Sequence, residues 1–259
     1  MKITKPDQVF PPPRIVLSAV EGWGKTTAGA YAPNSCLIMS EHETGYLTLR
    51  GSGLVPEVDC GLATNWVDLL NTLETLAKPD HPGYGVLALD AINGFERMCH
   101  ERVCQRDFKG DWGEKGFTSY QKGYDVAVTD WLQMLIALDN IRAKGTTILL
   151  IAHVQVRPFG NPLGADYDRY VVDVHKKTWG VTLKWADAVL FGNFKSVIDA
   201  KTGKAVGRAD RRLFTERRDG YDAKNRYGMP EYLDIPADPT RVWSSIWDSI
   251  TAKRGGSDA

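Results

Sequence analysis

The sequence predicts an α/β fold, in which helices cover both faces of a mainly parallel, twisted sheet and a C-terminal extension is antiparallel. Two observations favour this class. Short apolar runs alternate with helical patterns from residue 14 to residue 152, as expected of parallel strands that are buried on both faces. Beyond residue 153 the pattern changes to turns and short apolar runs, which predicts the antiparallel extension.

The first elements follow from apolar spacing and from proline and glycine. Pro11–Pro13 ends an N-terminal arm of residues 1–13, because proline neither continues a helix nor donates a hydrogen bond within a central strand. A buried strand is predicted over 14–20, a turn over 22–24 and a helix over 25–30. Further strands are predicted over 36–40 and 84–89, and helices over 65–77 and from about 93 to 106.

The second half begins with residues 108–124, which are rich in Gly, Trp, Lys and Asp and predict a loop that enters a helix over 126–143. A continuous apolar strand is predicted over 146–152, followed by short strands at 170–174, 188–191 and 212–215 and a closing helix over 243–253. Because the chain contains no repeat or low-complexity linker, we expect one domain over residues 14–253 and a flexible tail over 254–259.

The composition is that of a soluble globular protein. The 259 residues are 43% hydrophobic and 25% charged, and 32 Lys plus Arg balance 32 Asp plus Glu to a formal net charge of zero. This balance excludes a histone-like protein that coats polyanions, but not a local basic groove. Since the N-terminus lacks an apolar signal region and no run of 18 apolar residues occurs, we expect a cytoplasmic protein without membrane contact.

A phosphate-binding motif lies between the first predicted strand and helix. Residues 19–26 match G-x-x-x-x-G-K-[ST], except that Ala19 replaces the first glycine. In such a loop, backbone amides and the helix N-terminus cradle phosphate oxygens, the lysine neutralises the β- and γ-phosphates, and the hydroxyl ligates Mg²⁺. The alternative is a glycine-rich turn with an exposed lysine. We expect ATP to be bound by Glu21, Gly22, Trp23, Gly24, Lys25, Thr26 and Thr27, with Thr26 on the metal. Thr27 either assists or only caps the helix.

Three polar residues follow predicted strands at their carboxyl ends, where ligands bind in open α/β sheets. Asp90 is expected to hold Mg²⁺ through its water shell, unless it only caps the next helix. Glu41 is placed to polarise a water that attacks the γ-phosphate, unless it is a solvated loop carboxylate. His153 is placed to sense the γ-phosphate and to signal to the following loop, unless it is structural.

With these residues, the sequence resembles the RecA-like P-loop ATPases, in particular a phage-encoded nucleotide-binding group related to single-strand annealing recombinases. Ser40-Glu41-His42 stands where RecA has Ala-Glu-His, so the resemblance implies that Glu41 is the catalytic base. His153 matches the Gln or His that these proteins use as a γ-phosphate switch. The matches run from Val16 to Gly228.

The resemblance also implies catalysis between subunits and contact with DNA. Lys224 and Arg226 match a K-x-R segment whose cations reach the γ-phosphate on a neighbouring subunit, although a solvated loop is the alternative. Residues 154–178 correspond to a mobile DNA-binding loop, and residues 108–124 to a second loop that faces the channel or filament axis. The expected DNA-binding residues are Lys109, Lys115, Arg157, Phe159, Arg169, Lys176 and Lys177.

Cations also gather late in the chain. From Lys195 to Tyr227, ten Lys or Arg face five Asp or Glu, which favours a patch that contacts the DNA backbone. The densest part of this patch consists of Lys201, Lys204, Arg208, Arg211 and Arg212. The neutral chain therefore predicts a local DNA contact rather than a general affinity for nucleic acid.

These expectations combine into one functional hypothesis. The protein hydrolyses ATP with Mg²⁺, stimulated by DNA, and acts as a homo-oligomeric ring or filament on single-stranded DNA in phage recombination, annealing or replication. A phage or host single-strand-binding or replication protein is a candidate partner, and the location would be the cytoplasm of the bacterial host. Two alternatives use the same loop: a small-molecule kinase, and a nucleotide-switched loader or partner of a replication protein.

Overall fold

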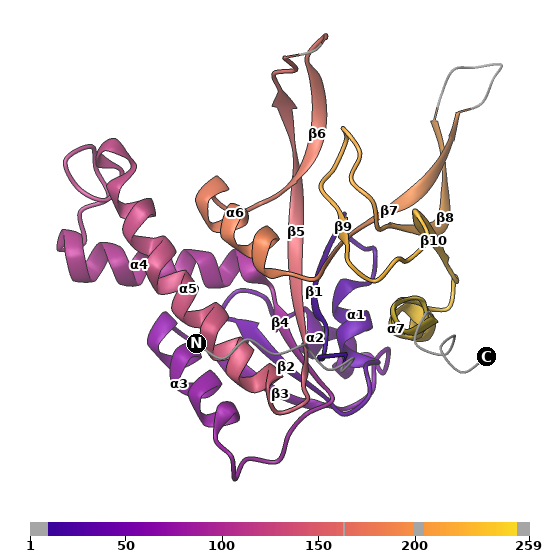
Figure 1. The fold of residues 1–259 in the computed structure, drawn as a ribbon, viewed down its shortest axis with the longest axis horizontal. Helices are drawn as coiled ribbons and strands as arrows, with labels where there is room; N and C mark the ends of the chain where they lie inside the picture. Colours follow the sequence, from indigo (N-terminus) through magenta and orange to yellow (C-terminus); the bar gives the residue numbers. More distant parts are fainter. Residues whose placement is uncertain (1–9, 163, 199–204, 253–259) are drawn as a thin grey trace, which may run out of the picture.

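The centre of the structure is a sheet that contains ten strands among the described residues (Figure 1). The protein is represented by a computed structural model, which describes residues 10–162, 164–198 and 205–252. The parallel strands lie in the order β7-β1-β5-β4-β2-β3. Their bounds are β1 Arg14–Ala19, β2 Ser35–Ser40, β3 Asp59–Ala63, β4 Val86–Asp90, β5 Thr147–Phe159 and β7 Ala188–Ile198.

Antiparallel strands extend this sheet after residue 153. They are β6 (Tyr167–Val172), β8 (Ala205–Phe214), β9 (Lys224–Asn225) and β10 (Tyr232–Ile235). The β6 strand pairs with the second half of β5, while β8 pairs with β7 and with β10. The predicted α/β fold class is confirmed, since the sheet is mainly parallel and carries an antiparallel C-terminal extension.

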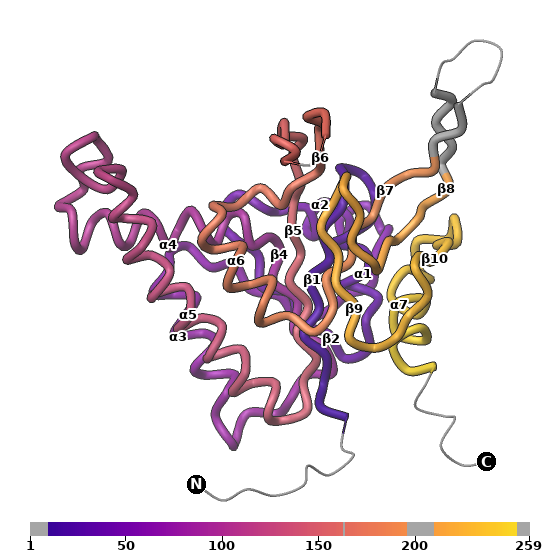
Figure 2. The backbone as a smooth tube through the Cα atoms, turned by 45° about the horizontal axis from the view of Figure 1, so that its top comes forward, coloured from indigo at the N-terminus to yellow at the C-terminus, as the bar shows by residue number. Residues whose placement is uncertain are grey.

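Helices pack on both faces of the sheet. Their bounds are α1 Lys25–Ala30, α2 Gly45–Gly51, α3 Trp66–Ala77, α4 Ile92–Phe108, α5 Lys122–Arg142, α6 Lys176–Trp185 and α7 Val242–Thr251, with short 3₁₀ helices at Ser119–Gln121 and Pro239–Arg241. Figure 2 shows α3, α4 and α5 grouped on one side and α1 with α7 on the other.

Two hydrophobic cores result, because successive residues of a strand face opposite sides. Along β1, Val16 packs in the core with α3, α4 and α5, whereas Ile15 and Leu17 pack in the core with α1, α2 and α7. Both cores lie directly against the parallel strands, so the carboxyl ends of these strands are held in fixed relative positions.

Much of the segment expected as a mobile loop, residues 154–178, forms regular structure instead. Val154 to Phe159 pair with Val172 to Tyr167 in an antiparallel hairpin that rises from the sheet (Figure 1), and α6 follows it. The strand continues past its apolar run because β5 goes on pairing with β6, although the side chains of residues 156–158 are exposed. The sequence of α6 has no helical periodicity of apolar residues, because the residues that this helix buries are Thr178 and Thr182. The Trp131 indole N–H donates to the Thr182 hydroxyl.

Other differences concern the ends of elements and of the chain. The α2 helix and β3 were not predicted, and β7 and β8 are longer than expected. Most of the predicted arm, residues 1–9, and the predicted tail, residues 254–259, lie outside the described residues. No described helix has the length and apolar character that crossing a membrane requires.

Candidate nucleotide-binding site

The loop between β1 and α1 lines a cavity of about 310 Å³ at the carboxyl ends of the parallel strands. Gly22 and Gly24 have φ angles of 69° and 106°, a region that glycine adopts without strain. Gly24 is the N-cap of α1, and no side chain caps the first amides of that helix. The lining residues are Glu21, Gly22, Gly24, Lys25, Thr26, Thr27, Glu43, Gly45, Leu49 and His153.

Trp23 does not line this cavity, although it was expected among the nucleotide contacts. Its side chain is fully buried and packs against Gly192 of β7, and its Nε1 donates to the carbonyl oxygen of Asn193 at 3.2 Å. Ala19, which replaces the first glycine of the motif, is buried at the same place. The tryptophan therefore anchors the loop to the neighbouring strand.

The Lys25 side chain folds back against the phosphate-binding loop. Its Nζ donates to the carbonyl oxygens of Ala19 and Val20 at 2.8 and 3.1 Å. Burial lowers the pKa of Lys25, while the carboxylates of Asp90, Glu21 and Glu43 act in the opposite direction. The ammonium is thus held close to the place where the motif binds phosphate.

Thr26 and Asp90 lie together, as expected. The Thr26 hydroxyl donates to Oδ2 of Asp90 at 2.6 Å, which joins the start of α1 to the end of β4. Asp90 is 4% exposed, and burial raises its pKa although the bond from Thr26 lowers it. A hydroxyl and a carboxylate side by side are the hard oxygen donors that Mg²⁺ prefers, so this pair fits the predicted metal.

Of the two glutamates that follow β2, Glu43 lines this cavity and Glu41 does not. Oε1 of Glu43 lies 3.1 Å from Nε2 of His153, and both residues line the cavity. The hydrogen bond with His153 is the main cause that lowers the pKa of Glu43. Glu41 is exposed and lines a separate small cavity with Gly94 and Arg97.

A local turn explains why Glu43 lines the cavity in place of Glu41. The amide of Glu43 donates to the carbonyl oxygen of Ser40 at 2.8 Å, which closes a turn directly after β2. This turn directs residue 43 back toward the sheet edge, whereas a strand that simply ran on would have presented residue 41. Both carboxylates closely follow the apolar strand, and no local signal in the sequence distinguishes Glu43 from Glu41.

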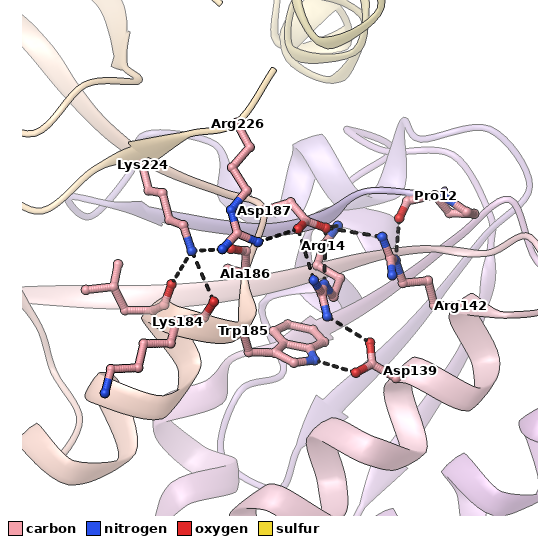
Figure 3. Close-up of polar contacts among 11 residues, drawn as sticks. Pro12, Arg14, Asp139, Arg142, Lys184, Trp185, Ala186, Asp187, Lys224 and Arg226 are labelled. Carbon is pink, nitrogen blue, oxygen red and sulfur yellow. Dashed lines mark hydrogen bonds and ion pairs between the residues drawn. The ribbon is translucent and has the colours of Figure 1, made fainter. Parts of the chain in front are cut away.

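Lys224 and Arg226 lie beside the amino end of β7, whereas the cavity is at the carboxyl ends of the parallel strands; Figure 3 shows their polar contacts. The Nζ of Lys224 donates to the carbonyl oxygens of Leu183, Lys184 and Ala186 at 2.8, 3.1 and 2.6 Å, which caps the C-terminal end of α6. Burial lowers the pKa of Lys224. Since these residues adjoin the start of β7, they do not meet the cavity of their own chain.

Arg226 belongs to a cluster around Asp187, the residue that precedes β7 (Figure 3). Asp187 forms ion pairs with Arg226 and Arg14 at 3.0 Å and with Arg142 at 3.3 Å. Burial raises the pKa of Asp187, but the bonds from Arg14 and the other arginines outweigh it and lower the pKa. The Arg226 side chain is still 51% exposed.

The predicted DNA-binding residues fall into two groups. Lys109 and Lys115 are exposed beside the tip of the α4–α5 pair, and Lys109 ends α4 with φ 54°. Arg157 on β5 and Lys176 at the start of α6 are also exposed, and they line a second cavity of about 420 Å³. These four cations are exposed to a ligand, although Arg157 also lies 3.9 Å from a carboxylate oxygen of Asp173.

The second group is engaged within the chain. Arg169 is 7% exposed, pairs with Asp222 at 2.7 Å and lies over the ring of Phe159. Lys177 forms an ion pair with Asp125. Their cationic groups stabilise the β5–β6 hairpin and the start of α6, so the hypothesis that they contact DNA has no support from their positions.

The late basic patch is only partly described. Lys201 and Lys204 lie outside the described residues, as does the side chain of Arg208. Arg212 pairs with Asp234 at 3.0 Å and stacks over the Tyr232 ring. This arginine is therefore held on the sheet by its neighbours.

A residue that the sequence did not single out joins the site to the β5–β6 hairpin. Asn93, three residues after Asp90, accepts a hydrogen bond from the amide of His153 at 2.8 Å through Oδ1. Its Nδ2 donates to the carbonyl oxygen of Asp173 at 2.7 Å. The amide of Asp173 in turn donates to the carbonyl oxygen of His153 at 3.0 Å. Asn93 thus fastens both strands of the hairpin at its base.

Known proteins resemble this chain over nearly its whole length. The model of a family described as "AAA domain" matches residues 11–227. The crystal structure of the RadB recombinase is similar with a TM-score of 0.45 and 14% sequence identity, over 89% of this chain and 90% of that chain. The comparison with curated proteins gave no match.

Proposed function

This chain belongs to the AAA domain family, and on that premise we propose that it binds ATP in the cavity between β1 and α1 and hydrolyses it. One observation carries the proposal. Lys25, Thr26, Glu43 and His153 line one cavity at the carboxyl ends of the parallel strands, and Asp90 at the end of β4 accepts the hydrogen bond of Thr26 behind it. This edge is where open α/β sheets bind ligands.

Each group has a role in hydrolysis that follows from its position. Lys25 neutralises the phosphates that the loop amides cradle. Glu43 orients and polarises the attacking water, since its lowered pKa keeps it an acceptor. His153 holds Glu43 in place and lies where β5 leaves the sheet. Mg²⁺, held by Thr26 and Asp90, would neutralise charge on the β- and γ-phosphates.

We further propose that the protein acts as a homo-oligomer on single-stranded DNA, in recombination, annealing or replication. The exposed cations Lys109, Lys115, Arg157 and Lys176 support a DNA contact. Arg226 remains the candidate for a residue that stabilises the transition state on a neighbouring subunit, because it is half exposed and cannot serve its own cavity. Lys224 has less support, since three carbonyl oxygens hold it.

The decisive experiment compares two glutamates. ATP turnover with Mg²⁺ is measured for the wild type, Glu43→Gln and Glu41→Gln, with and without single-stranded DNA. We expect Glu43→Gln to lower kcat by about 10²–10⁴-fold while it still binds ATP, and Glu41→Gln to resemble the wild type. If Glu41→Gln lowered kcat and Glu43→Gln did not, Glu41 would be the catalytic base instead.

Further outcomes test the wider proposal. A wild type that binds no ATP would refute it altogether. Turnover that requires a small-molecule acceptor, in a monomer whose Arg226→Ala variant is fully active, would favour the kinase alternative. Tight binding with slow turnover and no response to DNA would favour the nucleotide-switched loader.

A further inference from the structure

An arginine of the antiparallel extension lies beside the phosphate-binding loop. Arg211 is on β8, paired in register with Phe194 of β7 and Ile235 of β10. Its Nε lies 4.0 Å from the position that a Cβ on Gly24 would occupy. Its Nη1 donates to the carbonyl oxygen of Ala237 at 3.1 Å. Since Gly24 has no side chain, no other group separates the guanidinium from the loop backbone at this point.

Arg211 lacks the partners that its neighbours have. Among the residues that the structure describes, no carboxylate pairs with it, and its buried Nε has no hydrogen-bond partner. Arg212, the next residue and on the other face of the strand, pairs with Asp234 and stacks over Tyr232. An unsatisfied N–H on a cation is costly, and an anion beside Gly24 would give this guanidinium a partner, although Arg211 is not itself among the residues that line the cavity.

The charge of the cavity points to the same need. Its lining carries one lysine, Lys25, against two glutamates, Glu21 and Glu43, and the buried Asp90 lies directly behind Thr26. A nucleoside polyphosphate would bring several more negative charges into this environment. A further fixed cation beside Gly24 would offset them, and a guanidinium suits phosphate because it offers several donors in one plane.

We propose that Arg211 is a second cation of the nucleotide site, which acts within its own chain on the phosphates cradled by Gly24, Lys25 and Thr26. The inference rests on the proposed function, because it presupposes that the loop binds a nucleotide. It predicts selection for nucleoside di- and triphosphates over monophosphates. It also moves Arg211 from the expected DNA-contacting patch to the nucleotide site, and it makes the C-terminal extension part of that site.

The test uses three variants of the full chain: Arg211→Gln, Arg211→Lys and, as the matched control, Arg212→Gln. Binding of ATP, ADP and AMP is measured by calorimetry with Mg²⁺ at low and high salt. We expect Arg211→Gln to weaken ATP and ADP binding by about tenfold or more, with a smaller effect on AMP. Arg211→Lys should recover part of the affinity, and Arg212→Gln should stay within about twofold of the wild type.

Each other outcome has a distinct meaning. If the wild type binds ATP and Arg211→Gln binds it equally well, the inference fails while the proposed function stands. If Arg211→Gln weakens ATP and AMP equally, lowers Tm without nucleotide and is not improved by lysine, Arg211 is only structural and the inference fails. If the wild type binds no nucleotide, the proposed function fails and the inference falls with it.

Discussion

Replacement of Gly192 by alanine is expected to displace the phosphate-binding loop without touching any residue of the cavity. A Cβ at this position would lie 2.5 and 2.7 Å from two carbons of the Trp23 indole and 2.8 Å from the Cβ of Ala19. Such distances are too short for carbon atoms, so the surroundings must move. Neither neighbour can move easily, because Trp23 is fully buried and Ala19 lies in β1 between two strands.

The magnitude follows from this overpacking. Extra carbon in a well-packed core costs about 1–3 kcal/mol, and three contacts below 3 Å place Gly192→Ala toward the upper end of that range. Part of the strain should be relieved by movement of Trp23, which carries Gly22 and Gly24 with it. We therefore expect ATP affinity to fall by about tenfold, since displaced amides no longer converge on the phosphates.

Two measurements check this reasoning, urea unfolding without nucleotide and ATP binding at equilibrium. The control is Gly180→Ala in α6, where a Cβ would meet nothing within 4 Å. It should keep wild-type ATP affinity and should gain about 0.5–1 kcal/mol, because alanine favours a helix interior. A Gly192→Ala protein with wild-type stability and wild-type ATP affinity would refute the role of the Trp23 anchor.

Three further predictions concern the ion pairs and the hairpin base. The pKa of Glu43 is lowered, so turnover should persist below the ordinary pKa of glutamate. The contribution of the Glu43 carboxylate to stability is lost only as the pH falls through that lowered pKa. His153→Gln should move the acidic limb of the kcat/KM profile to higher pH, and an unmoved limb would argue against the Glu43–His153 pair. Asp187→Asn should lower the free energy of unfolding by about 3 kcal/mol, because among the described residues it leaves Arg142 and Arg226 without a carboxylate partner and Arg14 with Asp139 alone. Arg226→Ala, at a half-exposed pair, should cost no more than about 1 kcal/mol. Urea unfolding distinguishes the two variants, and equal losses would contradict the cluster. Asn93→Ala should leave basal ATP turnover close to that of the wild type but reduce its stimulation by single-stranded DNA, and full stimulation would show that the base of the hairpin transmits nothing.

The sequence could predict those parts of the site that depend on contiguous motifs. Lys25, Thr26 and Asp90 follow from a loop after one apolar strand and a carboxylate at the end of another, and the structure joins Thr26 to Asp90. His153 followed from the end of an apolar run in the same way. Such inferences require only that parallel strands end at a common edge.

The remainder depended on tertiary contacts that leave no local pattern. The turn closed by the amide of Glu43 decides which of two glutamates enters the cavity. The burial of Trp23 depends on Gly192, almost 170 residues later in the chain. Likewise, the sequence does not show that carbonyl oxygens at the end of α6 bind Lys224, or that the carboxylate of Asp187 binds Arg226.

The β5 strand is part of both the parallel sheet and the β5–β6 hairpin. Its first half is clamped between β1 and β4, and its second half is one side of a hairpin that projects from the sheet (Figure 1). Pairing with β4 ends at Leu150 and pairing with β1 ends at His153, so His153 is the residue at which β5 leaves the parallel sheet. The hairpin pairs from Val154 to Phe159, and six residues of strand span about 20 Å. Each degree of rotation of the hairpin about His153 would therefore move the Phe159 end by about a third of an ångström. A small rotation caused by a bound phosphate would thus be amplified along the hairpin.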